Sequence, residues 1–125
     1  MRLLLDTHIY IWALMDSRKL TKAARQAILD ADDVFVSAAS IWEAAIKPRL
    51  GKLDVDVNLL ASEIQASGFI ELPVRATHAA MMRELPDIHG DPFDRLLIAQ
   101  AMSEPLRLMT ADAQLAAYSE LVMPV

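Results

Sequence analysis

Short apolar runs alternate with helix-forming segments along the whole chain, and this alternation limits the possible folds more than any other feature. The run at residues 2–5 is too continuous for a half-exposed strand, so it indicates a buried central strand. Five strands are predicted, at residues 2–5, 34–36, 69–72, 106–110 and 121–123. Because helices separate them, the strands are expected to run parallel with right-handed crossovers. The predicted fold class is α/β, a three-layer α/β/α sandwich around a mostly parallel sheet.

Helical segments fill the intervals between these strands. Their apolar residues recur at helical spacing, and several follow a Ser, Thr or Asp that can cap a helix. Helices are expected through residues 9–14, 24–31, 41–46, 57–67, 75–84, 92–101 and 113–118. Pro48 is expected to kink or end the third helix because proline lacks a backbone donor. Gly51 is expected to end any helix that continues after Pro48. Gly68 is a candidate C-terminal cap.

Composition places the chain among compact globular proteins. Of its 125 residues, 54% are hydrophobic and 23% are charged, which fits one folded domain over residues 1–125 and excludes a disordered chain. No apolar run reaches the roughly 20 residues that a membrane-spanning helix needs, so no membrane association is expected. The chain has no Cys, which excludes disulfides and thiolate metal sites. A cytoplasmic location is the expectation that fits best.

The charge of the chain argues against simple electrostatic binding of nucleic acid, because the net charge is −5. Its basic residues are nevertheless clustered. One cluster contains Arg18, Lys19, Lys22 and Arg25, and the other contains Lys47, Arg49 and Lys52. Such clusters are usually solvated helix faces. A protein of this charge that binds RNA would need metal ions to offset its own carboxylates.

The stretch from Asp91 to Ala101 is the most informative local motif. Asp91 is a good N-cap, Pro92 suits the first helical position, and Asp94 falls at the third. The apolar residues that follow at helical spacing would bury one face of this helix. Acidic residues at a helix N-terminus have a sufficient structural explanation, because they complement the helix dipole. A functional role for this stretch therefore depends on other carboxylates reaching the same place.

Four acidic side chains are expected near the carboxyl ends of the parallel strands, where ligands bind in such sheets. They are Asp6, Glu43, Asp94 and Asp112, with Asp91 as a possible fifth. Each has a structural alternative: Ser40 and Glu43 match a capping box, and Asp112 follows Thr110, which can cap a helix. Four carboxylates at one end of one sheet would nevertheless repel one another, so the cluster indicates a bound divalent cation.

The ligand types select the metal and the chemistry. Carboxylates without Cys and without a His pair at helical spacing favour Mg²⁺ or Mn²⁺ over zinc. His8 and His89 lie close to acidic positions, and each is expected to form hydrogen bonds or to face the substrate rather than to bind metal. Divalent ions held by carboxylates are a device for phosphodiester hydrolysis, because they activate water and stabilise the leaving oxygen.

These residues resemble those of PIN-domain ribonucleases, and within them the VapC-type toxins of type II toxin–antitoxin pairs. The matching segments are LLLDTH at 3–8, VSAASIWE at 36–43, IK at 46–47, LGKL at 50–53, His89, DPFDRLLIAQA at 91–101 and TAD at 110–112. The long segment is highly specific, whereas DTH and TAD are weak when taken alone. Their order and spacing span the chain.

The resemblance implies a set of roles. Asp6, Glu43, Asp94 and Asp112 would be the catalytic, metal-binding quartet around Mg²⁺, with Mn²⁺ as a substitute. Asp91 would match a supporting or capping position, and Thr7 and Thr110 would match polar positions beside the metal. The implied activity is endoribonuclease cleavage of RNA. The implied partners are a cognate antitoxin and a second copy of the chain, in a homodimer or a toxin–antitoxin hetero-oligomer.

Two other readings compete with this one. A phosphorylated receiver domain has a similar length and a candidate acceptor in Asp54, but it needs a Lys after its last strand, and none follows Lys52. A catalytically inactive PIN-fold module that binds RNA or antitoxin is the second alternative, and the intact quartet argues against it. Trp12 and Trp42 could line an antitoxin groove, although core packing is the expected role of both.

Overall fold

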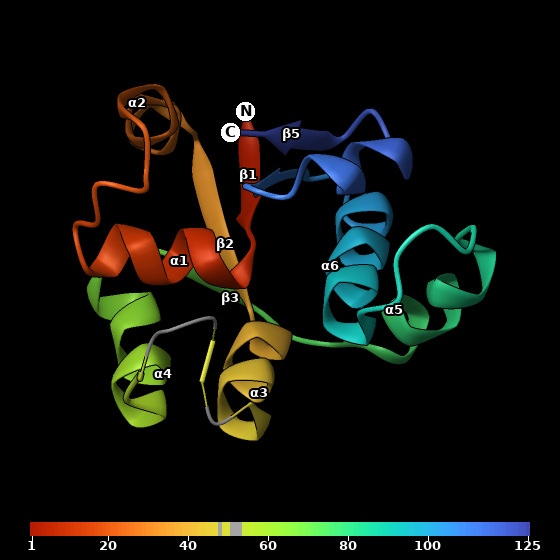
Figure 1. The fold of residues 1–125 in the computed structure, drawn as a ribbon, viewed down its shortest axis with the longest axis horizontal. Coiled ribbons are helices and arrows are strands. Elements are labelled where there is room, and N and C mark those ends of the chain that lie inside the picture. Colours follow the sequence, from red (N-terminus) through yellow and green to blue (C-terminus); the bar gives the residue numbers. More distant parts are fainter. Residues whose placement is uncertain (48, 51–53) are drawn as a thin grey trace.

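The computed structural model describes residues 1–47, 49–50 and 54–125. Within these residues, one sheet has the strand order β3-β2-β1-β4-β5, and all neighbouring strands run parallel (Figure 1). The strands are β1 (Arg2–Leu5), β2 (Asp33–Ser37), β3 (Ile70–Leu72), β4 (Arg107–Thr110) and β5 (Val122–Pro124). The predicted parallel sheet is confirmed, and β1 lies at its centre.

Helices connect the strands, as the alternation predicts. They are α1 (Thr7–Leu14), α2 (Lys22–Asp30), α3 (Ala38–Ile46), α4 (Val57–Ala66), α5 (Ala76–Met81) and α6 (Pro92–Ser103), with the 3₁₀ helices η1 (Met82–Glu84) and η2 (Ala113–Ala117). The helix expected over 75–84 is thus split into α5 and η1, and the one expected over 113–118 is a short 3₁₀ helix. No helix in the described ranges has the length and apolar character needed to cross a membrane.

The sheet separates two hydrophobic cores. Side chains alternate across a strand, so Leu3 and Leu5 of β1 enter one core and Leu4 enters the other. The first core lies under α1, α2 and α4, and the second lies under α5, α6 and η2. These helices occupy opposite sides of the sheet in Figure 1. The result is the predicted three-layer α/β/α arrangement.

Helix α3 begins where β2 ends and contributes to both cores, with Ala44 in the first and Ala39 in the second. Its N-cap is Ser37, whose hydroxyl accepts a hydrogen bond from the N–H of Ala39 at 3.0 Å. The capping box predicted at Ser40 and Glu43 is therefore wrong, because Ser40 lies inside the helix. The chain leaves α3 after Ile46. The effects predicted for Pro48 and Gly51 lie outside the described residues.

The two tryptophans differ in burial. Trp12 packs against the first core as a partly buried residue, as predicted. Trp42 is 54% exposed, and its ring meets that of Phe93 edge-on at 4.8 Å between centroids. The core role predicted for Trp42 is wrong, because it lies on the outer face of α3. Gly68 has φ +83° and follows Ser67, the C-cap residue of α4, so it lies at the position where a left-handed glycine commonly ends a helix, as predicted.

Candidate metal centre

Asp6 is the residue with which β1 passes into α1. It caps α1, accepting the Ile9 N–H at 2.9 Å, and it accepts a second hydrogen bond from the hydroxyl of Thr110. The residue is only 7% exposed. Burial raises the pKa of Asp6 to about 6 despite these two hydrogen bonds, and the charges of Glu43 and Asp112 add to the rise. Asp6 is therefore an acid whose charge is poorly compensated within the protein.

Glu43 is carried by α3 and is also buried. The helix is held in place at its start by the Ser37 cap and by the Thr7 hydroxyl, which donates to the Ser40 hydroxyl at 2.9 Å. One carboxylate oxygen, Oε2, accepts a hydrogen bond from the ammonium of Lys47 at 2.6 Å. The other, Oε1, is buried without any hydrogen-bond partner in the described residues. Such an orphaned buried acceptor requires an explanation, and a bound cation supplies one.

Asp91 is the N-cap of α6. Its Oδ1 accepts the N–H groups of Phe93 at 2.8 Å and Asp94 at 3.2 Å, as the sequence motif predicts. Its Oδ2 accepts a hydrogen bond from the ammonium of Lys47 at 3.0 Å. Burial opposes ionisation, but the Lys47 ammonium and the two backbone donors outweigh it and lower the pKa of Asp91. The negative charge of Asp91 is thus stabilised by donors within the protein.

Asp94 lies one turn further along α6 and behaves differently. Burial first, and then the charges of Asp91, Glu43 and Asp6, raise its pKa to about 6, although His89 opposes them. Three other carboxylates thus lie close enough to Asp94 to affect its charge. Asp94, Glu43 and Asp6 therefore form one electrostatically coupled group at the carboxyl ends of the strands.

Asp112 joins this group from the loop after β4. It caps η2 by accepting the Gln114 N–H at 3.0 Å, and its own N–H donates to the Thr110 hydroxyl at 3.0 Å. Its Oδ2 lies 3.2 Å from Nε2 of His89, and Oδ2 of Asp94 lies 3.8 Å from the same nitrogen. His89 therefore stands between the two aspartates.

The position of His89 is fixed from three directions. Its Nδ1 accepts the Asp91 N–H at 3.1 Å, and its backbone N–H donates to the Tyr118 hydroxyl at 2.7 Å. Arg95 donates to the same hydroxyl at 3.3 Å. Because Nδ1 serves as an acceptor, the hydrogen-bond network assigns the proton to Nε2. His89 thus points a donor at the carboxylates, as expected for a hydrogen-bonding residue.

The chain is similar to a known protein family and to a curated protein of that family. The family model described as "PIN domain" matches residues 3–121. The chain belongs to the PIN-domain family. It is 34% identical over 118 residues to "Ribonuclease VapC22" of Mycobacterium tuberculosis, covering 90% of this chain and 88% of that protein.

Solved structures show the same fold at lower identity. VapBC2 from Rickettsia felis, bound to a promoter DNA fragment, superposes with a TM-score of 0.67 at 15% identity, covering 98% of this chain and 96% of that chain. A toxin–antitoxin complex from Klebsiella pneumoniae gives a TM-score of 0.65 at 18% identity, covering 97% and 95%. These matches confirm the PIN-like α/β/α architecture predicted from the sequence.

The site of this PIN domain has the donors that a divalent cation needs. Among the described residues, ligand atoms of His89, Asp94 and Asp112 lie within 4.8 Å of one another, a group that contains His89 rather than Asp6 or Glu43. The carboxylates of those two residues are nevertheless coupled to it electrostatically. Oxygen donors, raised pKa values and the orphaned Glu43 oxygen fit Mg²⁺ or Mn²⁺.

The remaining predicted residues lie around this group. Thr110 bridges Asp6 and Asp112, which agrees with a polar position beside the acids. Thr7 instead joins α1 to α3 through Ser40. Sequence reasoning did not assign a role to Lys47, which bridges carboxylates on α3 and α6. The IK segment marked its position but not its contacts, because Asp91 is 44 residues away.

Proposed function

We propose that this PIN domain is a divalent-metal-dependent endoribonuclease that acts as the toxin of a type II toxin–antitoxin pair in the cytoplasm. The observation that carries the proposal is the coupled acidic group, in which two aspartates have raised pKa values beside an orphaned, buried glutamate oxygen. The similarity to a protein named as a ribonuclease supports the substrate class. The alternative, an inactive module, would have no need to maintain uncompensated buried acids.

The proposed roles follow from the contacts. Asp6, Glu43, Asp94 and Asp112 would hold Mg²⁺, or Mn²⁺ in its place. A cation bound there supplies a nucleophilic water and offsets negative charge on the phosphate during hydrolysis.

Other residues would keep the four acids in place. Asp91 and Lys47 fix the start of α6 against α3, and Thr110 orients Asp6 and Asp112. Thr7 fixes α3 through Ser40. The Nε2–H of His89, which faces Asp112 and Asp94, would help to orient these two carboxylates.

RNA cleavage tests the proposal directly. Wild-type protein is expected to cut RNA in Mg²⁺ or Mn²⁺ and to lose this activity with EDTA, whereas Asp94→Asn should be inactive in either ion. Asp87→Asn is a matched control, because Asp87 is exposed in the loop before α6. Equal activity of Asp94→Asn and wild type, or no cleavage by wild type in either ion, would contradict the proposal.

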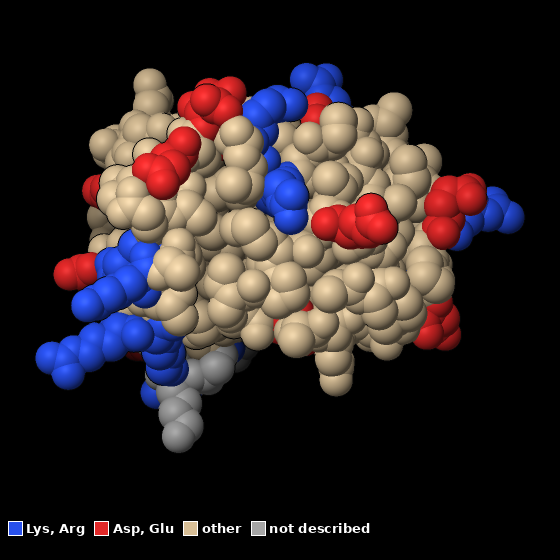
Figure 2. Space-filling view, turned by 90° about the horizontal axis from the view of Figure 1, so that it is seen from above, with Lys and Arg blue, Asp and Glu red and all other residues tan. Residues whose placement is uncertain are grey.

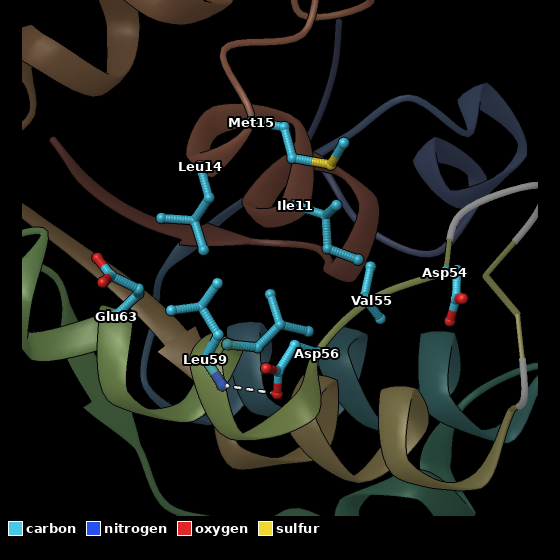
Figure 3. A pocket seen from close by; sticks show the side chains of 9 residues that line it. Ile11, Leu14, Met15, Asp54, Val55, Asp56, Leu59 and Glu63 are labelled. Atoms are coloured by element: carbon cyan, nitrogen blue, oxygen red, sulfur yellow. Dashed lines mark hydrogen bonds between the residues drawn. The ribbon is translucent and has the colours of Figure 1, made fainter.

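An antitoxin is the second part of the proposal, supported by a similar structure described as a toxin–antitoxin complex. A pocket of about 490 Å³ lies between α1 and α4, away from the acids (Figure 3). Figure 3 shows Leu14, Met15 and Leu59 facing one another there, with Asp56 and Glu63 at the rim. An apolar partner segment with basic flanks would fit this pocket.

Binding and assembly can be measured together. Met15→Glu on the exposed wall of the pocket should abolish binding of the cognate partner while RNA cleavage by the free protein persists. Light scattering after gel filtration would distinguish a homodimer from a hetero-oligomer. Unchanged partner binding by Met15→Glu would show that the partner binds another surface of the protein.

A further inference from the structure

One edge of α1 combines aromatic rings with the start of the acidic site. His8 and Trp12 lie one helical turn apart, and their ring centroids are 6.0 Å apart at an interplanar angle of 59°. Both residues are partly exposed. His8 follows Asp6 and Thr7 directly, so this edge begins at the carboxylates and leads away from them along the helix.

The segment that follows this edge, from the loop after α1 to the first residue of α2, is basic. The ammonium of Lys19 lies 5.9 Å from the centroid of the Trp12 ring. Arg18, Lys19 and Lys22 are exposed, and none of them takes part in an ion pair with another described residue. Figure 2 shows Lys and Arg side chains gathering at the corner of the molecule on the side of α1 and α2.

We propose that this edge, which we name the α1 strip (His8, Trp12, Arg18, Lys19 and Lys22), is the path of unpaired RNA nucleotides next to the cleaved bond. The inference rests on the proposed ribonuclease function and names where its substrate lies. Aromatic faces that stack bases, followed by cations that meet phosphates, are the usual elements of single-strand binding surfaces. Locally positive charge also offsets the net charge of −5 that otherwise repels RNA.

The other flank of the acids has a different character. On α3, Trp42 and Ile46 are exposed by 54% and 56%, and the nearby Lys47 is already held by Glu43 and Asp91. This flank offers apolar surface, and its cation nearest to the acids is already paired with two of them, whereas Arg18, Lys19 and Lys22 form no ion pair with another described residue. Charge complementarity therefore favours the α1 strip for RNA.

Tryptophan fluorescence can locate the RNA, because the chain has only two Trp residues. The titration uses the Asp94→Asn protein with Mg²⁺ and a 12-nucleotide single-stranded RNA. With Trp42→Phe added, the remaining Trp12 should be quenched by RNA. With Trp12→Phe added instead, Trp42 should respond weakly or not at all. Quenching confined to Trp42 would place the RNA along α3 and overturn the proposal.

Two further variants measure the separate contributions. Trp12→Leu should weaken RNA binding about tenfold through loss of base stacking. Lys19→Met should reduce the slope of log affinity against log salt by about 0.7, the value for one phosphate contact on a single strand. Arg83→Met, an exposed change on η1, is the matched control and should leave the slope unchanged. An unchanged slope for Lys19→Met would contradict a phosphate contact.

These outcomes separate the inference from the proposed function. If wild type cleaves RNA but Trp12 is not quenched and the salt slope is unchanged, the α1 strip is wrong and the ribonuclease proposal stands. If wild type does not cleave RNA at all, the proposed function fails first. Thermal melting of Trp12→Leu shows whether that variant loses affinity merely through unfolding, and Trp12→Phe, which retains an aromatic ring, should bind RNA more tightly than Trp12→Leu.

Discussion

Asp91 and Asp94 stand three residues apart at the start of one helix, yet their pKa values move in opposite directions. Asp91 receives two backbone N–H groups and the Lys47 ammonium, so its charge is stabilised by the protein itself. Asp94 is surrounded by other acids and is partly buried, and only His89 favours its charge. The comparison shows that compensation by donors, rather than sequence position, separates a structural carboxylate from one available to a ligand.

Kinetics should show the largest difference between the two aspartates. Asp94→Asn is expected to reduce RNA cleavage at least about a hundredfold, because metal stabilisation of the reaction is worth several kcal/mol. Asp91→Asn keeps the cap and should cost about tenfold, the lower end of the range that is typical of groups that support metal ligands. Steady-state cleavage rates at saturating Mn²⁺ measure both. Similar losses of cleavage rate for the two variants would contradict the distinction between a metal-binding Asp94 and a structural Asp91.

The pH dependence of stability should follow the uncompensated acids. Asp6 and Asp94 have pKa values of about 6 when folded, against an ordinary value of 3.8, so the folded protein binds protons more tightly than the unfolded chain in this window. Stability of the metal-free protein should therefore fall as pH rises from about 4 to about 6, by about 2 kcal/mol for each of the two acids, and this contribution should then level off.

Urea unfolding at several pH values measures this change. The double variant Asp6→Asn/Asp94→Asn should lose that part of the pH dependence and be more stable than wild type near neutral pH. Saturating Mn²⁺ should stabilise wild type and have little effect on the double variant. A wild-type protein that gains stability over the same window relative to the double variant would contradict the electrostatic picture.

Removing the compensated acid should destabilise the protein instead. Asp91→Ala deletes the cap of α6 and leaves Lys47 with one carboxylate, which should lower the free energy of unfolding by about 1–2 kcal/mol. Asp91→Asn should recover most of this loss, because an amide oxygen also accepts the two N–H groups. Equal stability of the Ala and Asn variants, measured by thermal melting, would show that the cap contributes little.

The smallest effect is expected at His89. Asn at this position can still accept a hydrogen bond from the Asp91 N–H, but its amide NH₂ group is too short to replace the donor that His89 points at Asp112 and Asp94. His89→Asn should therefore reduce cleavage about fivefold, the equivalent of one hydrogen bond of about 1 kcal/mol. Gln reaches further, so His89→Gln should retain more activity. An Asn variant as active as wild type would show that the Nε2–H is not used.

Local patterns predicted much of this arrangement. The central position of β1 follows from its continuous apolar run, and the Asp91 cap follows from the DPFD spacing, because both depend on neighbours in sequence. The start of α3 could not be chosen in this way. Ser37 and Ser40 are both able to cap a helix, and the end of β2 together with the buried partner Thr7 decides between them.

Long-range contacts account for what the sequence left open. His89 is held by Tyr118, 29 residues later, and Lys47 reaches an acid on another helix. Neither contact leaves a pattern in the local sequence. The exposure of Trp42 was missed for the same reason, because helical spacing does not show which face of α3 the rest of the chain covers.

The central strand β1 has a consequence for how the protein is made. Leu4 belongs to one core, and Leu3 and Leu5 belong to the other. The side chains of β1 are therefore all buried only when both cores have formed. Asp6 at its end meets Thr110 and Asp112 only after β4 has paired beside β1. A chain still emerging from the ribosome therefore carries its first acids without the last one. Synthesis itself delays assembly of the acidic site until nearly the whole domain is available to fold.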